Sequence, residues 1–192
     1  MLSLPHVFYY GLWHYPKAWI DAVSRPGDST VERGNTACKV MANAAHALKI
    51  VQAVGFIVWI LRYAPEVLTM RYGTSLLLTQ PGSVALGLAL IGLGQTFNVA
   101  VYQAIGKNGV YYGNRFGAEL GPWCTGFPFN VPVVGRHPQY FGVLSTMWGI
   151  VILIATKPAI AAGLVQMTAV WTCFYVVTSV MEQTEDAERK DK

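Results

Sequence analysis

Two short stretches of this sequence carry side chains that could do chemistry. The first, GRHPQYFG, places Arg136, His137 and Tyr140 at the start of a long apolar run. The second, VMEQTEDAE, places Glu182 where another apolar run stops. Together these residues offer a guanidinium, an imidazole, a phenol and a carboxylate, which can hold a charged ligand by hydrogen bonds and ion pairs. His137 and Glu182 could also accept a proton in general acid–base catalysis.

Each of these residues also has a structural explanation that requires no ligand. Arg136 could anchor a helix among lipid phosphates. Pro138 is a common first residue of a helix, and His137 before it could then be only a cap. Glu182 could be a carboxylate at the headgroup level that begins an acidic tail. A site is favoured only if the surrounding elements bring the two stretches together.

The composition indicates a membrane protein. Of the residues, 53% are hydrophobic and only 12% are charged, which is about half the charged fraction usual in a soluble domain. No charged side chain lies between Arg71 and Lys107, between His137 and Lys157, or between Lys157 and Glu182. A helix of about 20 apolar residues crosses a bilayer, so each of these gaps has room for one membrane span.

The sequence predicts an all-α integral membrane protein that forms one domain, 1–192. A fourth candidate span carries His46 and Lys49, and a lysine near a helix end can extend its charge to the headgroups. The N-terminal segment, 1–39, is rich in Tyr and Trp, which favour the membrane interface, so we expect an interfacial or re-entrant helix there. Residues 182–192 would form a cytosolic tail. The four expected transmembrane helices cover residues 40–61, 83–105, 140–156 and 158–181.

The order of the spans predicts the orientation of the protein in the membrane. It also predicts that GRHPQYFG and VMEQTEDAE meet at one membrane surface. Four spans place the N-terminus, the loop 106–138 and the C-terminus on one side, where most Lys and Arg residues fall. The positive-inside rule identifies that side as cytosolic. The turn between the last two spans is little more than Lys157-Pro158, so these spans form an antiparallel hairpin. The hairpin returns the chain to the surface where it started, and we expect Glu182 to meet His137 there.

The last span also has a polar and aromatic stripe. Counting back from Glu182 at helical spacing reaches Thr178, Tyr175, Trp171 and Thr168, which therefore share its face of the helix.

Several common kinds of site lack their sequence patterns. The three cysteines show no CxxC or metal-type spacing, so we expect neither a disulfide nor a metal site. No basic run with interleaved aromatics indicates nucleic-acid binding. The segment GLALIGLGQTFN contains Gly87, Gly92 and Gly94, but it neither follows a strand nor opens a helix as the dinucleotide fingerprint requires. Small residues at such close spacing usually allow membrane helices to pack closely.

In this order, the motifs resemble those of the integral-membrane phospholipid N-methyltransferases. The resemblance runs through LGLALIGLGQTFN, GVYYGNRFG, GFPFN, HPQYFG and the terminal ME. The plant-type branch is the most similar, because it shares the N-terminal FYYGLWHYPKAWID and AHALKIVQ stretches as well. The family implies transfer of a methyl group from S-adenosylmethionine to phosphatidyl-N-methylethanolamine and phosphatidyl-N,N-dimethylethanolamine, giving phosphatidylcholine in the endoplasmic reticulum membrane.

The resemblance implies which residues bind the methyl donor. The glycine pair of the family falls on Gly92 and Gly94. Its acidic pair falls on Glu182 and Gln183, where the second acid is replaced, so Glu182 either suffices alone or shares the role with Glu185. Arg136 and His137 are further candidates beside the donor.

On the lipid side we expect roles for residues of the loop and of GRHPQYFG. Tyr111 and Tyr112 could offer aromatic faces to the headgroup ammonium, and Arg115 or Arg136 could bind the lipid phosphate. For catalysis we expect His137, Glu182 and Tyr140, with His137 or a carboxylate as the acceptor of the amine proton.

Two alternatives stay open at this point. The stretch RHPxYxG is similar to that of isoprenylcysteine carboxyl methyltransferases, although those enzymes continue well past the acidic pair whereas this sequence ends at Lys192. The chain could also be a non-catalytic membrane protein that uses the glycine-rich span for helix association. Nothing in the sequence indicates an oligomeric state or the number of methylation steps.

Overall fold

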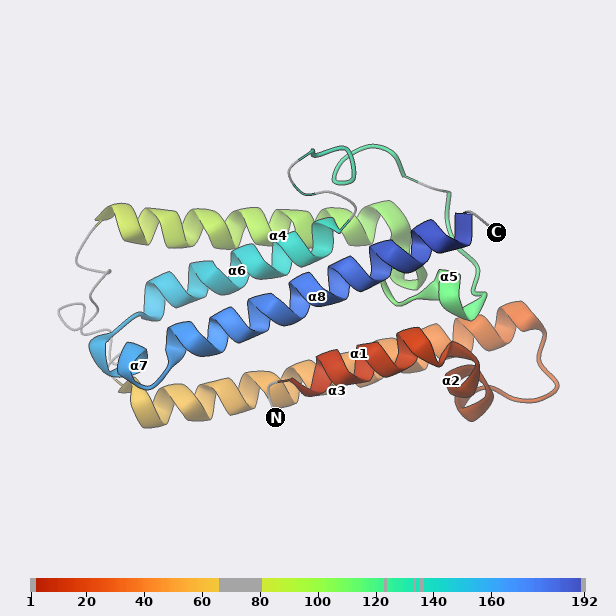
Figure 1. Cartoon of the computed structure of the whole chain (residues 1–192), viewed down its shortest axis with the longest axis horizontal. Helices are drawn as coiled ribbons and strands as arrows, with labels where there is room; N and C mark the ends of the chain where they lie inside the picture. The colour runs from red at the N-terminus through yellow and green to blue at the C-terminus, as the bar shows by residue number, and fades with distance from the viewer. Residues whose placement is uncertain (1–2, 66–80, 123, 133, 135–136, 191–192) are drawn as a thin grey trace. The chain divides into compact units, whose positions relative to one another are not determined.

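The computed structural model describes residues 3–65, 81–122, 124–132, 134 and 137–190, and for residues 183–190 it describes the backbone alone. The described residues form helices joined by turns and loops, without a β-strand (Figure 1). The expected all-α class is therefore confirmed. The helices are α1 Leu4–His14, α2 Pro16–Val23, α3 Thr30–Tyr63, α4 Pro81–Val110, α5 Gly113–Phe116, α6 Pro138–Ile154, α7 Lys157–Ala161 and α8 Leu164–Lys190.

Contacts group the chain into two compact units. Unit 1 comprises Met1–Ala53 and Val99–Gly135, and unit 2 comprises Val54–Asn98 and Arg136–Lys192. The long helices α3 and α4 each contribute one part to each unit.

Three of the described helical stretches are long and apolar enough to cross a membrane: Thr30–Tyr63, Pro81–Phe116 and Leu164–Glu182. The helix α6 is apolar but has only 17 residues, which is about the minimum for a span. Within α4, Gly106 has φ +66° and ψ 179°, a conformation that glycine adopts readily and other residues avoid. The regular helix therefore stops after residue 105, where the sequence predicts the end of that span.

The connection between the last two apolar helices differs from the predicted turn at Lys157-Pro158. The helix α6 ends at Ile154, and the short helix α7 follows before α8 begins at Leu164. Thr156 caps α7 because its hydroxyl accepts a hydrogen bond from the backbone N–H of Ala159 at 3.2 Å. Gly163 then adopts φ +93°, which interrupts the helix. The prediction of one continuous helix over 158–181 was therefore wrong at its start, although α6 and α8 do pack side by side (Figure 1).

The helix α3 begins well before the predicted start of the first span at residue 40. Its N-terminus is a capping box formed by Ser29 and Glu32. The Glu32 carboxylate accepts hydrogen bonds from the Ser29 N–H at 2.9 Å and hydroxyl at 2.7 Å, and the Glu32 N–H donates to Ser29 Oγ at 3.3 Å. A helix started in this way can run through polar residues into the apolar segment, so its start does not mark a membrane boundary.

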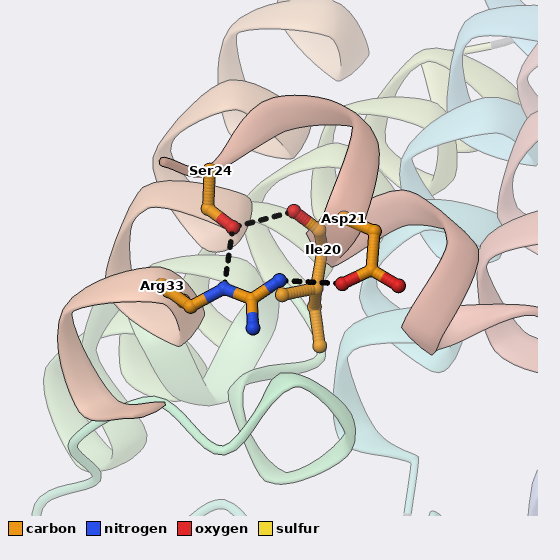
Figure 2. A network of polar contacts seen from close by, with 4 residues as sticks. All are labelled: Ile20, Asp21, Ser24 and Arg33. Atoms are coloured by element: carbon orange, nitrogen blue, oxygen red, sulfur yellow. Dashed lines mark hydrogen bonds and ion pairs between the residues drawn. The ribbon is translucent and has the colours of Figure 1, made fainter. Parts of the chain in front are cut away.

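The N-terminal segment forms two helices rather than the single one expected, because Pro16 starts α2 directly after α1 ends. Figure 2 shows how the end of α2 joins α3. Arg33 Nε donates a hydrogen bond to Ser24 Oγ at 2.9 Å, and the same guanidinium forms an ion pair with Asp21. The Ser24 hydroxyl in turn donates to the carbonyl of Ile20 at 2.6 Å. These contacts hold the end of α2 against the first turns of α3.

In unit 1, small residues of α3 allow the chain after α4 to approach closely. A Cβ at Gly34 would lie 2.6 Å from the backbone oxygen of Phe116. Asn108 Nδ2 donates hydrogen bonds to Asn35 Oδ1 at 3.0 Å and to the carbonyl of Glu119 at 2.9 Å, which holds the same segment against α3. The buried core of this unit consists of Leu12, Trp13, Ala37, Cys38, Met41, Ala42, Ala45, Tyr111, Tyr112 and Phe116.

In unit 2, α4 and α6 meet at two pairs of glycines. Gly87 lies opposite Gly149 and Gly94 lies opposite Gly142, so the two helices run antiparallel. At the far end of α6 a small apolar core contains Ala64, Val151, Ile154, Ala159 and Leu164.

Candidate functional site

Three of the predicted site residues, His137, Tyr140 and Glu182, meet in unit 2. His137 and Tyr140 belong to the start of α6, and Glu182 lies on α8, which packs along α6. The Tyr140 hydroxyl donates a hydrogen bond to Glu182 Oε1 at 2.6 Å. His137 Nδ1 lies 3.3 Å from Glu182 Oε2. We call these three residues the polar cluster, and the convergence predicted from the helical hairpin is confirmed.

Local helix geometry explains why His137 and Tyr140 act together. His137 is the N-cap of α6, and Pro138 is the first helical residue. Tyr140 comes three residues after His137, and residues three apart are neighbours on the same face of a helix. Their rings are parallel to within 5°, with centroids 5.3 Å apart. The stack directs Nδ1 of the imidazole and the hydroxyl of the phenol toward the same carboxylate.

Glu182 is almost completely buried, with 7% of its surface exposed. A buried carboxylate is costly unless hydrogen bonds or opposite charges compensate it. Each of its two oxygens has a contact in the polar cluster, Oε1 with Tyr140 and Oε2 with His137. The side chain is therefore held inside the helical hairpin and does not merely begin the polar tail.

The predicted stripe on α8 faces into unit 2. The ring of Tyr175 lies 5.6 Å from that of Tyr140 at an angle of 53°, so Tyr175 forms a further wall of the polar cluster. Trp171 contacts Phe56 at 6.4 Å between ring centroids, and Thr168 is buried. Thr178 donates its hydroxyl to the carbonyl of Phe174 at 2.8 Å, a contact within α8.

The imidazole of His137 leaves one polar atom without a hydrogen bond. Its Nε2 is buried and has no hydrogen-bond partner among the residues that the structure describes. A buried polar atom without a partner is uncommon in proteins and calls for an explanation such as a ligand or a role in proton transfer. The polar cluster therefore offers a fixed carboxylate beside a nitrogen that can bind or accept a proton.

The two glycines of the predicted donor-binding pair have different surroundings. No described atom lies within 4 Å of where a Cβ of Gly92 would be. A Cβ at Gly94 would instead collide with Thr146 Oγ1 and the carbonyl oxygen of Gly142, and would lie 2.7 Å from the backbone nitrogen of Thr146. Gly94 is thus enclosed by α6, whereas Gly92 leaves room for a ligand.

The predicted lipid-binding residues fall in unit 1, whereas the polar cluster falls in unit 2. Tyr111 and Tyr112 are buried in the core of that unit, and the hydroxyl groups of Tyr111 and Tyr102 form a hydrogen bond of 2.8 Å. The guanidinium of Arg115 lies 3.9 Å from the centre of the Trp13 ring and donates to the Trp13 carbonyl at 3.2 Å.

Two further predicted donor-binding residues cannot be placed. Arg136 and the side chain of Gln183 lie outside the described part of the protein. The described residues also contain no group of three or more His, Cys, Asp or Glu side chains that could hold a metal ion.

Two residues of α6 that contact α4 have no assigned role in the sequence-based prediction. A Cβ at Gly142 would lie 2.7 Å from the carbonyl oxygen of Gly94. Thr146 donates its hydroxyl to the carbonyl of Gly142 at 2.9 Å and accepts a hydrogen bond from Gln95 at 3.0 Å. The signal that could have revealed the contact is the equal spacing of seven residues from Gly87 to Gly94 and from Gly142 to Gly149.

Comparison with known families shows the family to which the chain belongs. A family model described as phospholipid methyltransferase matches residues 83–184, which include all three residues of the polar cluster. The chain belongs to the phospholipid methyltransferase family. The family resemblance read from the sequence motifs is therefore confirmed.

Individual relatives differ in how much of the chain they match. A phosphatidyl-N-methylethanolamine N-methyltransferase of Arabidopsis thaliana is 30% identical over 190 residues, which are 98% of this chain and 92% of the relative. The protein of the same name from Saccharomyces cerevisiae is 36% identical over 103 residues, 54% of this chain and 47% of its own length. The Homo sapiens phosphatidylethanolamine N-methyltransferase is 32% identical over 111 residues, 58% of this chain and 52% of its own. No solved structure matches the chain.

Proposed function

We propose that this phospholipid methyltransferase uses S-adenosylmethionine to methylate phosphatidyl-N-methylethanolamine and phosphatidyl-N,N-dimethylethanolamine, giving phosphatidylcholine. The name of the Arabidopsis relative, which aligns with nearly the whole chain, supports this choice of substrate. The observation that carries the proposal is the polar cluster, in which Tyr140 and His137 hold the buried carboxylate of Glu182. It lies inside the part of the chain that matches the family.

The polar cluster fits the cationic end of such a methyl donor. A carboxylate has about four positions that accept hydrogen bonds, so Glu182 can bind an ammonium group while it keeps its contacts with Tyr140 and His137. The family resemblance adds Gly92, Arg136 and Gln183 to this side of the site. Among them, Gly92 has open space around it, which allows a ligand to approach its backbone.

When bound, the donor supplies a methyl carbon on a sulfonium sulfur, which an amine nitrogen attacks in line. The amine must be unprotonated to attack, and we assign the acceptance of its proton to His137 Nε2, directly or through a water molecule. A proton on Nε2 makes the imidazole cationic, and the adjacent Glu182 carboxylate at Nδ1 stabilises that charge. Tyr140 keeps the carboxylate oriented by donating to its other oxygen.

The sequence-based candidates for binding the lipid are Arg115, Tyr111 and Tyr112, which all lie in unit 1. Arg115 is the strongest of the three candidates, because a guanidinium can bind a phosphate with two parallel hydrogen bonds. Its stacking on Trp13 would hold the planar group in a fixed orientation. Tyr111 and Tyr112 are buried, so we assign them the support of this region, and their aromatic face for the headgroup stays a sequence-based prediction.

We place the enzyme in the endoplasmic reticulum membrane with both termini in the cytosol. The long apolar helices support a membrane location. The excess of Lys and Arg on the side that holds both termini supports the orientation.

The proposal is tested with purified protein in detergent and donor labelled in its methyl group. Phosphatidylethanolamine, its monomethyl and dimethyl forms, and a prenylcysteine peptide are offered separately. We expect label in the monomethyl and dimethyl lipids. Label in the prenylcysteine peptide alone would favour a carboxyl methyltransferase, and no transfer to any of the four acceptors would contradict the proposed enzyme class.

A further inference from the structure

The contact between α4 and α6 lies next to the polar cluster. At this contact, the backbones of Gly94 and Gly142 approach so closely that neither position has room for a side chain. Gly142 follows Tyr140 by only two residues, within the second turn of α6. The first turns of α6 therefore rest directly on the backbone of α4.

Side chains around the glycine contact fix the same part of α6. Gln95 donates to Thr146 Oγ1 at 3.0 Å, and Thr146 donates to the carbonyl of Gly142 at 2.9 Å. The rings of Phe97 and Phe141 meet edge to face, with centroids 5.0 Å apart. Both the polar and the apolar contacts thus act on the turn that carries Tyr140.

A second glycine pair makes a similar contact without reaching the polar cluster. A Cβ at Gly149 would lie 2.6 Å from the carbonyl oxygen of Gly87, much as one at Gly142 would lie 2.7 Å from that of Gly94. Gly149 follows Tyr140 by nine residues, which is about two and a half helical turns. This pair provides an internal comparison for the first.

We propose that Gly94 is a positioning residue for methyl transfer. Through its contact with Gly142 it sets the place of the first turns of α6, and so the distances from Tyr140 and His137 to Glu182. Gly92, one half of the family's glycine pair, would face the methyl donor, while Gly94, the other half, would face α6. This assignment rests on the proposed function, because it concerns how that reaction is supported.

Gly94 can affect methyl transfer because the contacts of the polar cluster tolerate only small shifts of α6. The hydrogen bond from Tyr140 to Glu182 is 2.6 Å long, and hydrogen bonds weaken steeply as distance and alignment change. An alanine at position 94 would collide with backbone atoms of α6, which cannot move away as a flexible side chain can. The helix must shift, and Tyr140 shifts with it.

The test compares four variants in detergent: Gly94→Ala, Gly142→Ala, Gly149→Ala and Gly92→Ala. Thermal unfolding, equilibrium dialysis with labelled donor, and kcat are measured for each. We expect Gly142→Ala to reproduce Gly94→Ala, with kcat lowered by about tenfold or more. The matched control Gly149→Ala should lower the melting temperature as much as Gly94→Ala and Gly142→Ala do. The kcat of this control, once folded, should stay within about twofold of the wild-type value.

The variant Gly92→Ala should weaken donor binding without a change in melting temperature. The positioning role would be contradicted if Gly94→Ala weakened donor binding while its melting temperature and kcat stayed normal. It would also be contradicted if Gly142→Ala behaved like Gly149→Ala. Should Gly94→Ala fail to fold, Thr146→Val removes the hydroxyl link to Gly142 with little change in volume, and we expect lower kcat with normal donor affinity.

A double-mutant cycle separates this inference from the proposed function. Tyr140→Phe is combined with Gly94→Ala and, as a control, with Gly149→Ala, and melting temperatures are measured without donor or lipid. We expect the double variant Gly94→Ala/Tyr140→Phe to lower the melting temperature by less than the sum of the two single changes. For Gly149→Ala and Tyr140→Phe, the two changes in melting temperature should add. Additive effects in both pairs would overturn the positioning role. A wild-type protein that transfers no methyl group would overturn the proposed function alone.

Discussion

At the scale of single residues, the polar cluster depends on how its carboxylate is held. Glu182 is buried, and Tyr140 and His137 each contact one of its oxygens. The stacked rings bring both contacts to the same place. Removing one contact should therefore weaken the cluster without removing the charge.

We expect Tyr140→Phe to preserve the fold and to lower activity. The substitution keeps the ring that stacks on His137 and removes the hydroxyl that donates to Glu182. A hydrogen bond to a charged group is worth about 1.5–3 kcal/mol, so methyl transfer should fall by about tenfold or more. Rates with saturating labelled donor and lipid measure the effect.

Tyr63→Phe is the matched control, because Tyr63 lies in the same unit and is exposed. Its activity should equal that of the wild type. Full activity in Tyr140→Phe would show that the hydroxyl of Tyr140 has no part in the reaction.

At the scale of helices, the connection between α6 and α8 determines where Glu182 arrives. The helix α7 is capped by Thr156, and the chain turns at Gly163 with φ +93°. Only glycine adopts this conformation at little cost. The turn therefore depends on one residue.

We expect Gly163→Ala to destabilise the protein by about 1–2 kcal/mol, because an L side chain is strained at that backbone conformation. Thermal unfolding in detergent measures the change. The control is Gly11→Ala in α1, where no described atom would contact the added Cβ and the substitution should be neutral or stabilising by up to about 1 kcal/mol. Equal melting temperatures for Gly163→Ala and the wild type would contradict the strained turn.

The apolar pattern predicts the helices well because a membrane-spanning helix depends mainly on the composition of its own segment and not on what packs against it. The charge-free gaps correctly indicate α4, α6 and most of α8, and the hairpin of α6 and α8 predicts that His137 and Tyr140 meet Glu182. The pattern does not predict the break at Gly163. Pro158 is a favourable helix start, so the sequence is equally compatible with a single helix that begins there and runs through residue 163. The equal seven-residue spacing of glycines in the two helices is the one sequence signal for the packing of Gly94, and it does not by itself show which backbone lies opposite.

At the scale of the whole molecule, the protein is a membrane protein built from helices. Within the described residues, three stretches have the length and composition of membrane spans, and the family match covers residues 83–184. The helix α6, with 17 residues, is the shortest of the four expected spans and is therefore the one whose crossing most needs a test.

We expect Arg25 and Lys157 to lie on opposite sides of the membrane. In a protein whose own cysteines are replaced by serine, Arg25→Cys and Lys157→Cys are labelled in sealed microsomes with a membrane-impermeant maleimide. The cysteine at 25 should react at once, and the one at 157 only after detergent opens the vesicles. Both positions are exposed in the protein, so accessibility should depend on the membrane alone. Equal labelling of both positions in sealed vesicles would contradict the predicted order, in which three spans separate Arg25 from Lys157.

The most direct test of the account is methyl transfer by Glu182→Gln. The amide keeps the shape of the side chain and can still accept a hydrogen bond from Tyr140. It lacks the negative charge with which, in our proposal, Glu182 binds the ammonium group of the methyl donor. Labelled donor and phosphatidyl-N-methylethanolamine are supplied to the variant and to the wild type. We predict that donor affinity falls by about tenfold or more while the melting temperature shows a folded protein. Unchanged donor affinity and unchanged transfer would contradict the assignment of the polar cluster to the methyl-transfer site.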